Sequence, residues 1–173
     1  MRLFEFIVEN QSRQLAWQGN PNIGWWEDQD VLRLYHGTHV RNVDSVLANG
    51  LTRKDPTTGM ISLALEPNTA YGYASMSGTG GEASFRAAGS KVEHTPQQER
   101  AVFVLDVPMT WIRQHYDPNL SGNIGQAKEH MRSKEKYVEW MKKYNDDQSY
   151  YALAELRVRT AVPPNFIVGY MIK

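Results

Sequence analysis

The run RAVFVLDVP, residues 100–108, is the feature of this sequence that most narrows its fold. Apolar residues fill almost every position and a proline closes the run, which makes it the clearest strand of the chain. Four further stretches have patterns typical of strands: residues 31–35, 59–65, 149–162 and 166–173. The last two are joined by Pro163-Pro164 and form a terminal pair.

Patterns typical of helices separate these strands, in residues 41–50, 67–76, 109–116 and about 126–144. The first of them ends at Asn49-Gly50, a common C-terminal stop. Pro67 opens the second, because proline is favoured in the first turn of a helix. Strands alternating with short helices and long loops predict a mixed α+β domain.

We expect residues 1–30 to form an N-terminal segment and residues 31–173 to form the domain itself. Residues 1–12 carry apolar side chains between acidic ones, which predicts a short helix or a docking arm that packs on the domain or on a partner. Residues 10–29 are polar and rich in turn residues around Trp25-Trp26, and we interpret them as a connector. Residues 77–98 are small, polar and glycine-rich, as loops with a functional role often are.

Composition removes several classes of function. The 19 basic residues balance 19 acidic ones, so no overall charge directs the chain to nucleic acid or to a membrane. The absence of cysteine excludes disulfides, thiol nucleophiles and thiolate metal sites. The histidines lack metal-ligand spacing, so no metal is expected. No apolar run is long enough to span a membrane and no signal peptide is recognisable, so we expect a cytoplasmic, intracellular or virion-associated protein.

The stretch YHGTHVRNVDSVLANGL, residues 35–51, resembles the first motif of ADP-ribosyltransferases of the diphtheria-toxin and poly(ADP-ribose) polymerase type. In that motif an aromatic residue, His, Gly and Ser or Thr precede an Asn and a helix ending in Gly-Leu. Residues 59–75, GMISLALEPNTAYGYAS, are similar to the second motif, a strand followed by a helix with a tyrosine. Residues 154–172, AELRVRTAVPPNFIVGYMI, are similar to the third, in which a glutamate begins a late strand.

This resemblance implies a split β-sandwich with short helices around a cleft for NAD, which is the substrate. It assigns Glu155, His36 and Tyr73 to catalysis. Cleavage of NAD releases nicotinamide through a transition state that resembles an oxocarbenium ion, so a carboxylate near the ribose stabilises the developing charge. Glu155 would do this and bond a ribose hydroxyl, while His36 would bond another.

The remaining expected NAD contacts are Gly37, Thr38, Ser62 and Tyr71. The backbone of Gly37 would approach the nicotinamide amide, because glycine has no side chain in the way. Thr38 would bond the adenine-side ribose or close the turn. Tyr73, with Tyr71 as the competing choice, would stack on nicotinamide. Ser62 stands where the polymerase subgroup has a second stacking tyrosine, so transfer of a single ADP-ribose is expected rather than polymer synthesis.

We expect the acceptor to be a macromolecule, either a protein or a nucleic acid. Three alternatives to a mono-ADP-ribosyltransferase of macromolecules remain open. One is an RNA 2′-phosphotransferase, although that chemistry needs several Arg or His side chains around a phosphate. The others are a rifamycin-type transferase for small molecules and a non-catalytic protein of the same fold, such as a structural protein of a viral particle.

Overall fold

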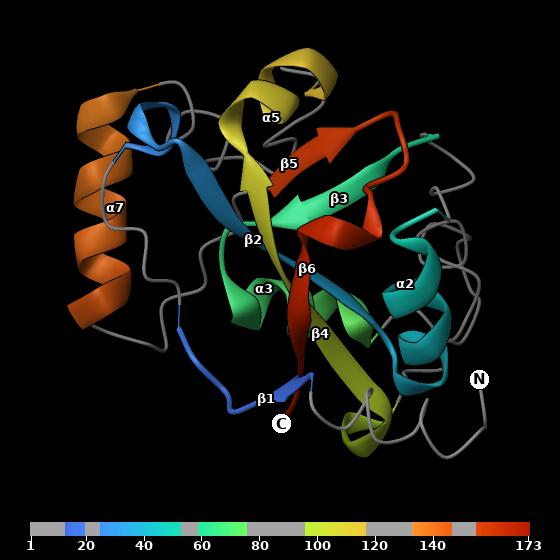
Figure 1. Ribbon diagram of the computed structural model, residues 1–173. Helices are drawn as coiled ribbons and strands as arrows, with labels where there is room; N and C mark the ends of the chain where they lie inside the picture. The colour runs from blue at the N-terminus through green and yellow to red at the C-terminus, as the bar shows by residue number, and fades with distance from the viewer. Residues whose placement is uncertain (1–12, 20–24, 53–58, 76–95, 117–132, 147–154) are drawn as a thin grey trace, which may run out of the picture.

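The computed structural model describes residues 13–19, 25–52, 59–75, 96–116, 133–146 and 155–173. The strands are β1 (Gln14–Leu15), β2 (Val31–His39), β3 (Ile61–Ala64), β4 (Arg100–Pro108), β5 (Glu155–Val158) and β6 (Ile167–Ile172). The α-helices are α2 (Val43–Asn49), α3 (Pro67–Ala74), α5 (Met109–His115) and α7 (Lys134–Asp146). Short 3-10 turns are η1 (Trp26–Asp28), η2 (Val40–Asn42), η3 (Gln97–Glu99) and η4 (Pro164–Phe166). The predicted mixed α+β fold is confirmed (Figure 1).

The strands form one six-stranded sheet in the order β1-β6-β4-β2-β3-β5. β1 runs parallel to β6, and the other neighbouring strands are antiparallel. β2 and β4 pair along their whole length, from Val31 opposite Pro108 to His39 opposite Arg100. β2 and β3, in contrast, pair at one position only, Tyr35 opposite Ala64. The pair β3–β5 is therefore joined to the rest of the sheet at one point, and in Figure 1 it runs at an angle to β2.

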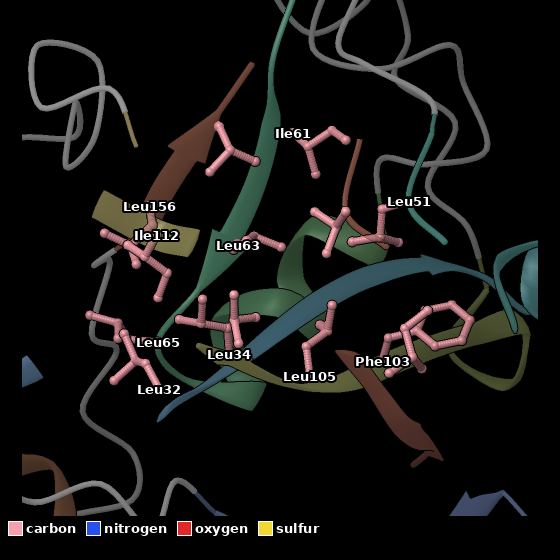
Figure 2. Packing of buried hydrophobic residues seen from close by; sticks show 14 of the residues in the cluster. Leu32, Leu34, Leu51, Ile61, Leu63, Leu65, Phe103, Leu105, Ile112 and Leu156 are labelled. Atoms are coloured by element: carbon pink, nitrogen blue, oxygen red, sulfur yellow. The ribbon is translucent and has the colours of Figure 1, made fainter. Parts of the chain in front are cut away.

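The main core lies on one face of this sheet. Alternate residues of a strand project to the same face, so Leu32 and Leu34 of β2 meet Phe103 and Leu105 of β4 there, all with 0% exposure. Figure 2 shows these side chains with leucines of β3 and β5 and with Ile112 of α5. Helices α2, α5 and α7 also contribute buried residues to this cluster. Burial of this apolar surface supplies the main drive to fold.

Helix α3 covers the opposite face, over β2 (Figure 1). Its Ala70 is buried in a smaller cluster with Tyr35 of β2 and Val102 of β4, and its Ala74 is also fully buried. The helix comes so close that a Cβ atom on Gly37 would lie 1.7 Å from the backbone oxygen of Ala70. Gly37 is therefore required for the packing of the helix on the strand.

The described part of the expected N-terminal segment belongs to the sheet and the core. Gln14 and Leu15 form β1 beside β6, and Trp26 is only 3% exposed, with its ring 5.5 Å from that of Tyr116. These described residues therefore contact parts of the chain that are distant in sequence, and the division into a segment 1–30 and a domain 31–173 stays a prediction. The expected docking arm 1–12, residues 77–95 of the expected loop and residues 126–132 of the expected helix lie outside the described residues.

Two helix boundaries agree with the sequence. Gly50 ends α2 with φ of 77°, a backbone conformation that favours glycine. Pro67 occupies the first turn of α3. β2 extends four residues beyond the expected end at residue 35, so His36 lies within a strand rather than after one. Among the helices that the structure describes, none has the length and apolar character of a membrane span.

Candidate functional site

The side chain of His36 links β2 to β3 next to Tyr35–Ala64, the one backbone pair that joins these strands. The boundary between β2 and β3 is named the open seam. Its ring nitrogen Nδ1 lies 2.9 Å from the backbone oxygen of Ser62, across the seam from its own strand. A carbonyl oxygen only accepts hydrogen bonds, so Nδ1 carries the proton and donates. The other ring nitrogen, Nε2, is then a hydrogen-bond acceptor in the neutral imidazole. The histidine is held in one tautomer by the backbone of β3.

The surroundings of His36 favour this neutral form. Burial lowers its pKa, and the bond to the Ser62 carbonyl opposes that shift only in part. At neutral pH the side chain therefore presents an acceptor nitrogen and no charge. An acceptor of this kind suits a hydroxyl group of a ligand.

Glu155 lies at the start of β5, in line with the single pair that joins β2 to β3. It stands opposite Ala64, which in turn stands opposite Tyr35 of β2. With neighbouring strands about 4.8 Å apart, the Cα atoms of residues 36 and 155 are roughly 10 Å apart. Glu155 is 1% exposed although it carries a carboxyl group. A charge shielded from water interacts more strongly with a bound group than an exposed one.

The strand register also decides which way these side chains leave the sheet. Paired residues project to the same face, so Tyr35 and Glu155 project toward the face that α3 covers. His36, as the next residue of β2, starts toward the opposite face and reaches into the seam through its contact with Ser62. The two side chains thus flank β3 from different strands and start toward opposite faces of the sheet.

Arg157 is a buried partner of Glu155 that the sequence reading missed. Its Nε and Nη2 atoms each lie 2.6 Å from the same carboxylate oxygen, Oε1 of Glu155. The arginine is 4% exposed and stands opposite Ser62 in the β3–β5 pairing. The available signal was strand alternation, because residues two apart on a strand share a face.

Thr38 and Gly37 have structural partners inside the protein. The Thr38 hydroxyl oxygen accepts a hydrogen bond of 2.9 Å from the side chain of Asn42, as expected if the threonine closes the turn. Asn42 precedes α2 at its N-cap position, although its side chain makes no cap bond. The space beside Gly37 is filled by α3, so the missing side chain serves helix packing. The expected approach of the Gly37 backbone to nicotinamide stays a prediction.

The two candidate tyrosines of α3 lie on different flanks of the helix. Residues two positions apart on an α-helix are rotated by about 200°. Tyr71 is directed toward the strands of the β4–β6 side: its ring contacts Trp17 edge-on at 5.7 Å, and Arg100 of β4 lies 5.0 Å from its centre. Tyr73 therefore lies on the flank away from β4 and β6, and its hydroxyl group is buried. Of the two, Tyr73 is on the side of the sheet to which β3 and β5 belong.

A metal site is not indicated by the part of the chain that the structure describes, where no three His, Asp or Glu side chains gather. Comparisons with protein-family models, with curated proteins and with solved structures found no match. The family resemblance therefore rests on the residues of the three motifs. What the geometry adds is the contact of the His36 ring with the Ser62 carbonyl and the position of Glu155 opposite Ala64 on the far side of β3.

Proposed function

We propose that this protein is an NAD-dependent mono-ADP-ribosyltransferase, which moves one ADP-ribose from NAD to a macromolecular acceptor and releases nicotinamide. The observation that carries the proposal is the seam between β2 and β3. It is joined at one residue pair; the His36 imidazole named by the motifs reaches across it to β3, and Glu155 lies on β5, the strand on the other side of β3. A sheet divided in this way is what the proposed split β-sandwich requires.

The residues fit the chemistry of the nicotinamide ribose. Nε2 of His36 accepts a hydrogen bond from one ribose hydroxyl, because its tautomer is fixed by the Ser62 carbonyl. The Glu155 carboxylate accepts from another hydroxyl. Two acceptors on the strands that flank β3 suit a diol, which offers two donors. Binding both hydroxyl groups orients the ribose for cleavage.

The carboxylate also acts on the bond that breaks. As the bond between ribose and nicotinamide lengthens, positive charge develops on the ribose ring, and the negative charge of Glu155 stabilises it. The leaving nicotinamide takes the electron pair of that bond and becomes neutral. The acceptor nucleophile then forms the new bond to the ribose carbon and releases its proton to water. Tyr73 stacks on the nicotinamide ring in this proposal, since Tyr71 is turned toward β4.

Nicotinamide release tests the proposal directly. The wild-type chain is incubated with NAD and cell lysate, and nicotinamide is measured together with label transferred from labelled NAD. We expect Glu155→Gln to lower the rate by about 100- to 1000-fold, since it removes the charge that stabilises the transition state. Glu99→Gln is the matched control, because the Glu99 carboxylate is 44% exposed and pairs with His39.

Two further measurements identify the acceptor and test the phosphotransferase alternative. Digestion of the labelled product by protease or by nuclease identifies the acceptor as protein or nucleic acid. A 2′-phosphorylated oligonucleotide serves as the competing substrate for the phosphotransferase alternative. Absence of nicotinamide release and of label from the wild type, under conditions where the protein is folded, would reject the proposed function.

A further inference from the structure

Arg157 is buried in the middle of β5, where an arginine needs a specific reason. Arginine is rarely buried without a partner, because its charge is costly to remove from water. Here the side chain is 4% exposed and its partner is the 1% exposed Glu155. The two residues lie on the same strand, two positions apart, and therefore project to the same face.

The contact between them fixes the glutamate. Two donors of one guanidinium group, Nε and Nη2, converge on Oε1 of Glu155 at 2.6 Å. Both residues are held by their backbone pairing, Glu155 opposite Ala64 and Arg157 opposite Ser62. With the backbone fixed and one carboxylate oxygen held by two bonds, the Glu155 side chain is restricted to one orientation.

The same arginine is also linked to the histidine side of the seam. Ser62, which stands opposite Arg157 on β3, provides the carbonyl oxygen that holds Nδ1 of His36. The order across the sheet is therefore His36, Ser62, Arg157, with Glu155 two residues before Arg157 on β5. A displacement of Arg157 would change the orientation of the Glu155 carboxylate, which it contacts directly. It would also shift β3 through the strand pairing with Ser62.

We propose that Arg157 is a positioning residue, which holds the Glu155 carboxylate in one orientation for the ribose of NAD. The inference rests on the proposed function, because it gives Arg157 a role in the same reaction. Arg157 acts through Glu155 and contacts neither the ribose nor nicotinamide in this account. The positive charge of Arg157 offsets part of the negative charge of Glu155. Arg157 therefore favours the reaction by orienting the carboxylate and not by adding charge.

The experiment compares four variants by steady-state nicotinamide release and by thermal unfolding. Arg157→Met should lower kcat by about 100-fold, the loss typical of a misplaced catalytic group, with KM for NAD changed by less than about threefold. Arg157→Lys keeps the charge but lacks the two fixed donors, so its kcat should lie about tenfold below that of the wild type. Arg159→Met is the matched control, because Arg159 is exposed just beyond β5, and its kcat should equal that of the wild type.

The double variant Glu155→Gln/Arg157→Met separates stability from positioning. If Arg157→Met unfolds because the buried Glu155 carboxylate has lost the guanidinium group, the double variant should have a higher Tm than Arg157→Met, and Arg157→Lys then decides the question. A tenfold lower kcat for a folded Arg157→Lys supports the inference. Equal kcat values for Arg157→Lys and the wild type, or for Arg157→Met and Arg159→Met, would overturn it.

The outcomes also distinguish this inference from the proposed function. If Glu155→Gln is inactive while Arg157→Met keeps the wild-type kcat, the positioning role fails and the transferase proposal stands. If the wild type and Glu155→Gln release nicotinamide at the same rate, the transferase proposal fails and the positioning role fails with it.

Discussion

The two sides of strand β2 are joined to the sheet in different ways. On one side β4 pairs with every residue from Val31 to His39. On the other side β3 pairs with β2 at Tyr35 alone, and the next link is a side chain, the ring of His36 bonded to the Ser62 carbonyl. Figure 1 shows the contrast as two strands that run together and two that diverge.

The residues on the two sides of β2 also differ in chemical type, apolar on the β4 side and ionisable on the β3 side. Along β4, the positions from 101 to 105 are all buried and apolar, so this seam is stabilised by packing. On the other side, the His36 imidazole reaches across to β3, and beyond β3 lie the Glu155 carboxylate and the Arg157 guanidinium group on β5, both almost fully buried. Buried ionisable groups lower the free energy of unfolding, and they are concentrated at functional sites. We therefore expect the continuous β2–β4 pairing, named the closed seam, to account for stability. The proposed NAD cleavage is assigned to the open seam between β2 and β3.

The largest effect on stability should come from the closed seam. Phe103 stands opposite His36 on β4 and is 0% exposed. Phe103→Ala leaves a cavity in the core and should lower the free energy of unfolding by roughly 3–5 kcal/mol, measured by urea denaturation. Val168→Ala on β6 is the control, because Val168 is 41% exposed and its removal should change stability by less than about 0.5 kcal/mol.

The activity of these two variants tests whether the β2–β4 side of the sheet serves stability and not catalysis. Nicotinamide release per folded molecule should be the same for Phe103→Ala and the wild type at a temperature where both are folded. A loss of stability below about 1 kcal/mol for Phe103→Ala would contradict the assignment of the core to this seam.

Gly37 gives the next largest effect, because helix α3 packs against it. In Gly37→Ala the new Cβ would collide with the backbone at Ala70 and Ala74, which cannot move without the helix. We expect a loss of about 3 kcal/mol, the upper range for overpacking. Gly72→Ala on the same helix has open space around the new atom and should stabilise the protein by about 0.5–1 kcal/mol. Equal stabilities for the two variants, by thermal or urea unfolding, would show that α3 does not pack here.

The smallest effect concerns the pH dependence of stability at the open seam. Burial lowers the pKa of His36 below its ordinary value of 6.5, so below that pH the unfolded chain binds more protons than the native one. Stability should therefore fall as the pH decreases from 7 to 5, with a contribution from His36 of at most about 1.4 kcal/mol per pH unit.

The variant His36→Asn isolates this contribution. Urea denaturation at pH 5, 6, 7 and 8 should show a shallower decrease toward low pH for His36→Asn than for the wild type. Parallel curves over the whole range would mean that the imidazole is not kept neutral by its surroundings, and the assignment of Nε2 as an acceptor would lose its support.

The sequence predicted the regular elements better than it predicted their partners. The strand at residues 100–108 and the helix that begins at Pro67 are confirmed, because local patterns of apolar residues and helix-start signals specify them. β1 was missed, since a strand of two residues has no periodicity and depends on pairing with β6. Residues 36–39 are polar or glycine, and they join β2 because β4 offers a long partner.

The candidate site shows the same division. The motifs named His36 and Glu155, but they could not show that Ser62 contributes its carbonyl oxygen rather than its side chain. Arg157 was missed because an arginine in a strand is usually exposed, and only the tertiary structure places it against the carboxylate. The flank of α3 on which Tyr71 lies also became visible only once the helix was placed on the sheet, with Trp17 beside Tyr71.

The most direct test of the central claim is a crystal structure of the protein with a non-hydrolysable NAD analogue. The account predicts density for the analogue across the seam between β2 and β3, with ribose hydroxyl groups within hydrogen-bond distance of Nε2 of His36 and of the Glu155 carboxylate. Density elsewhere on the molecule, or a seam without ligand at saturating analogue, would contradict it.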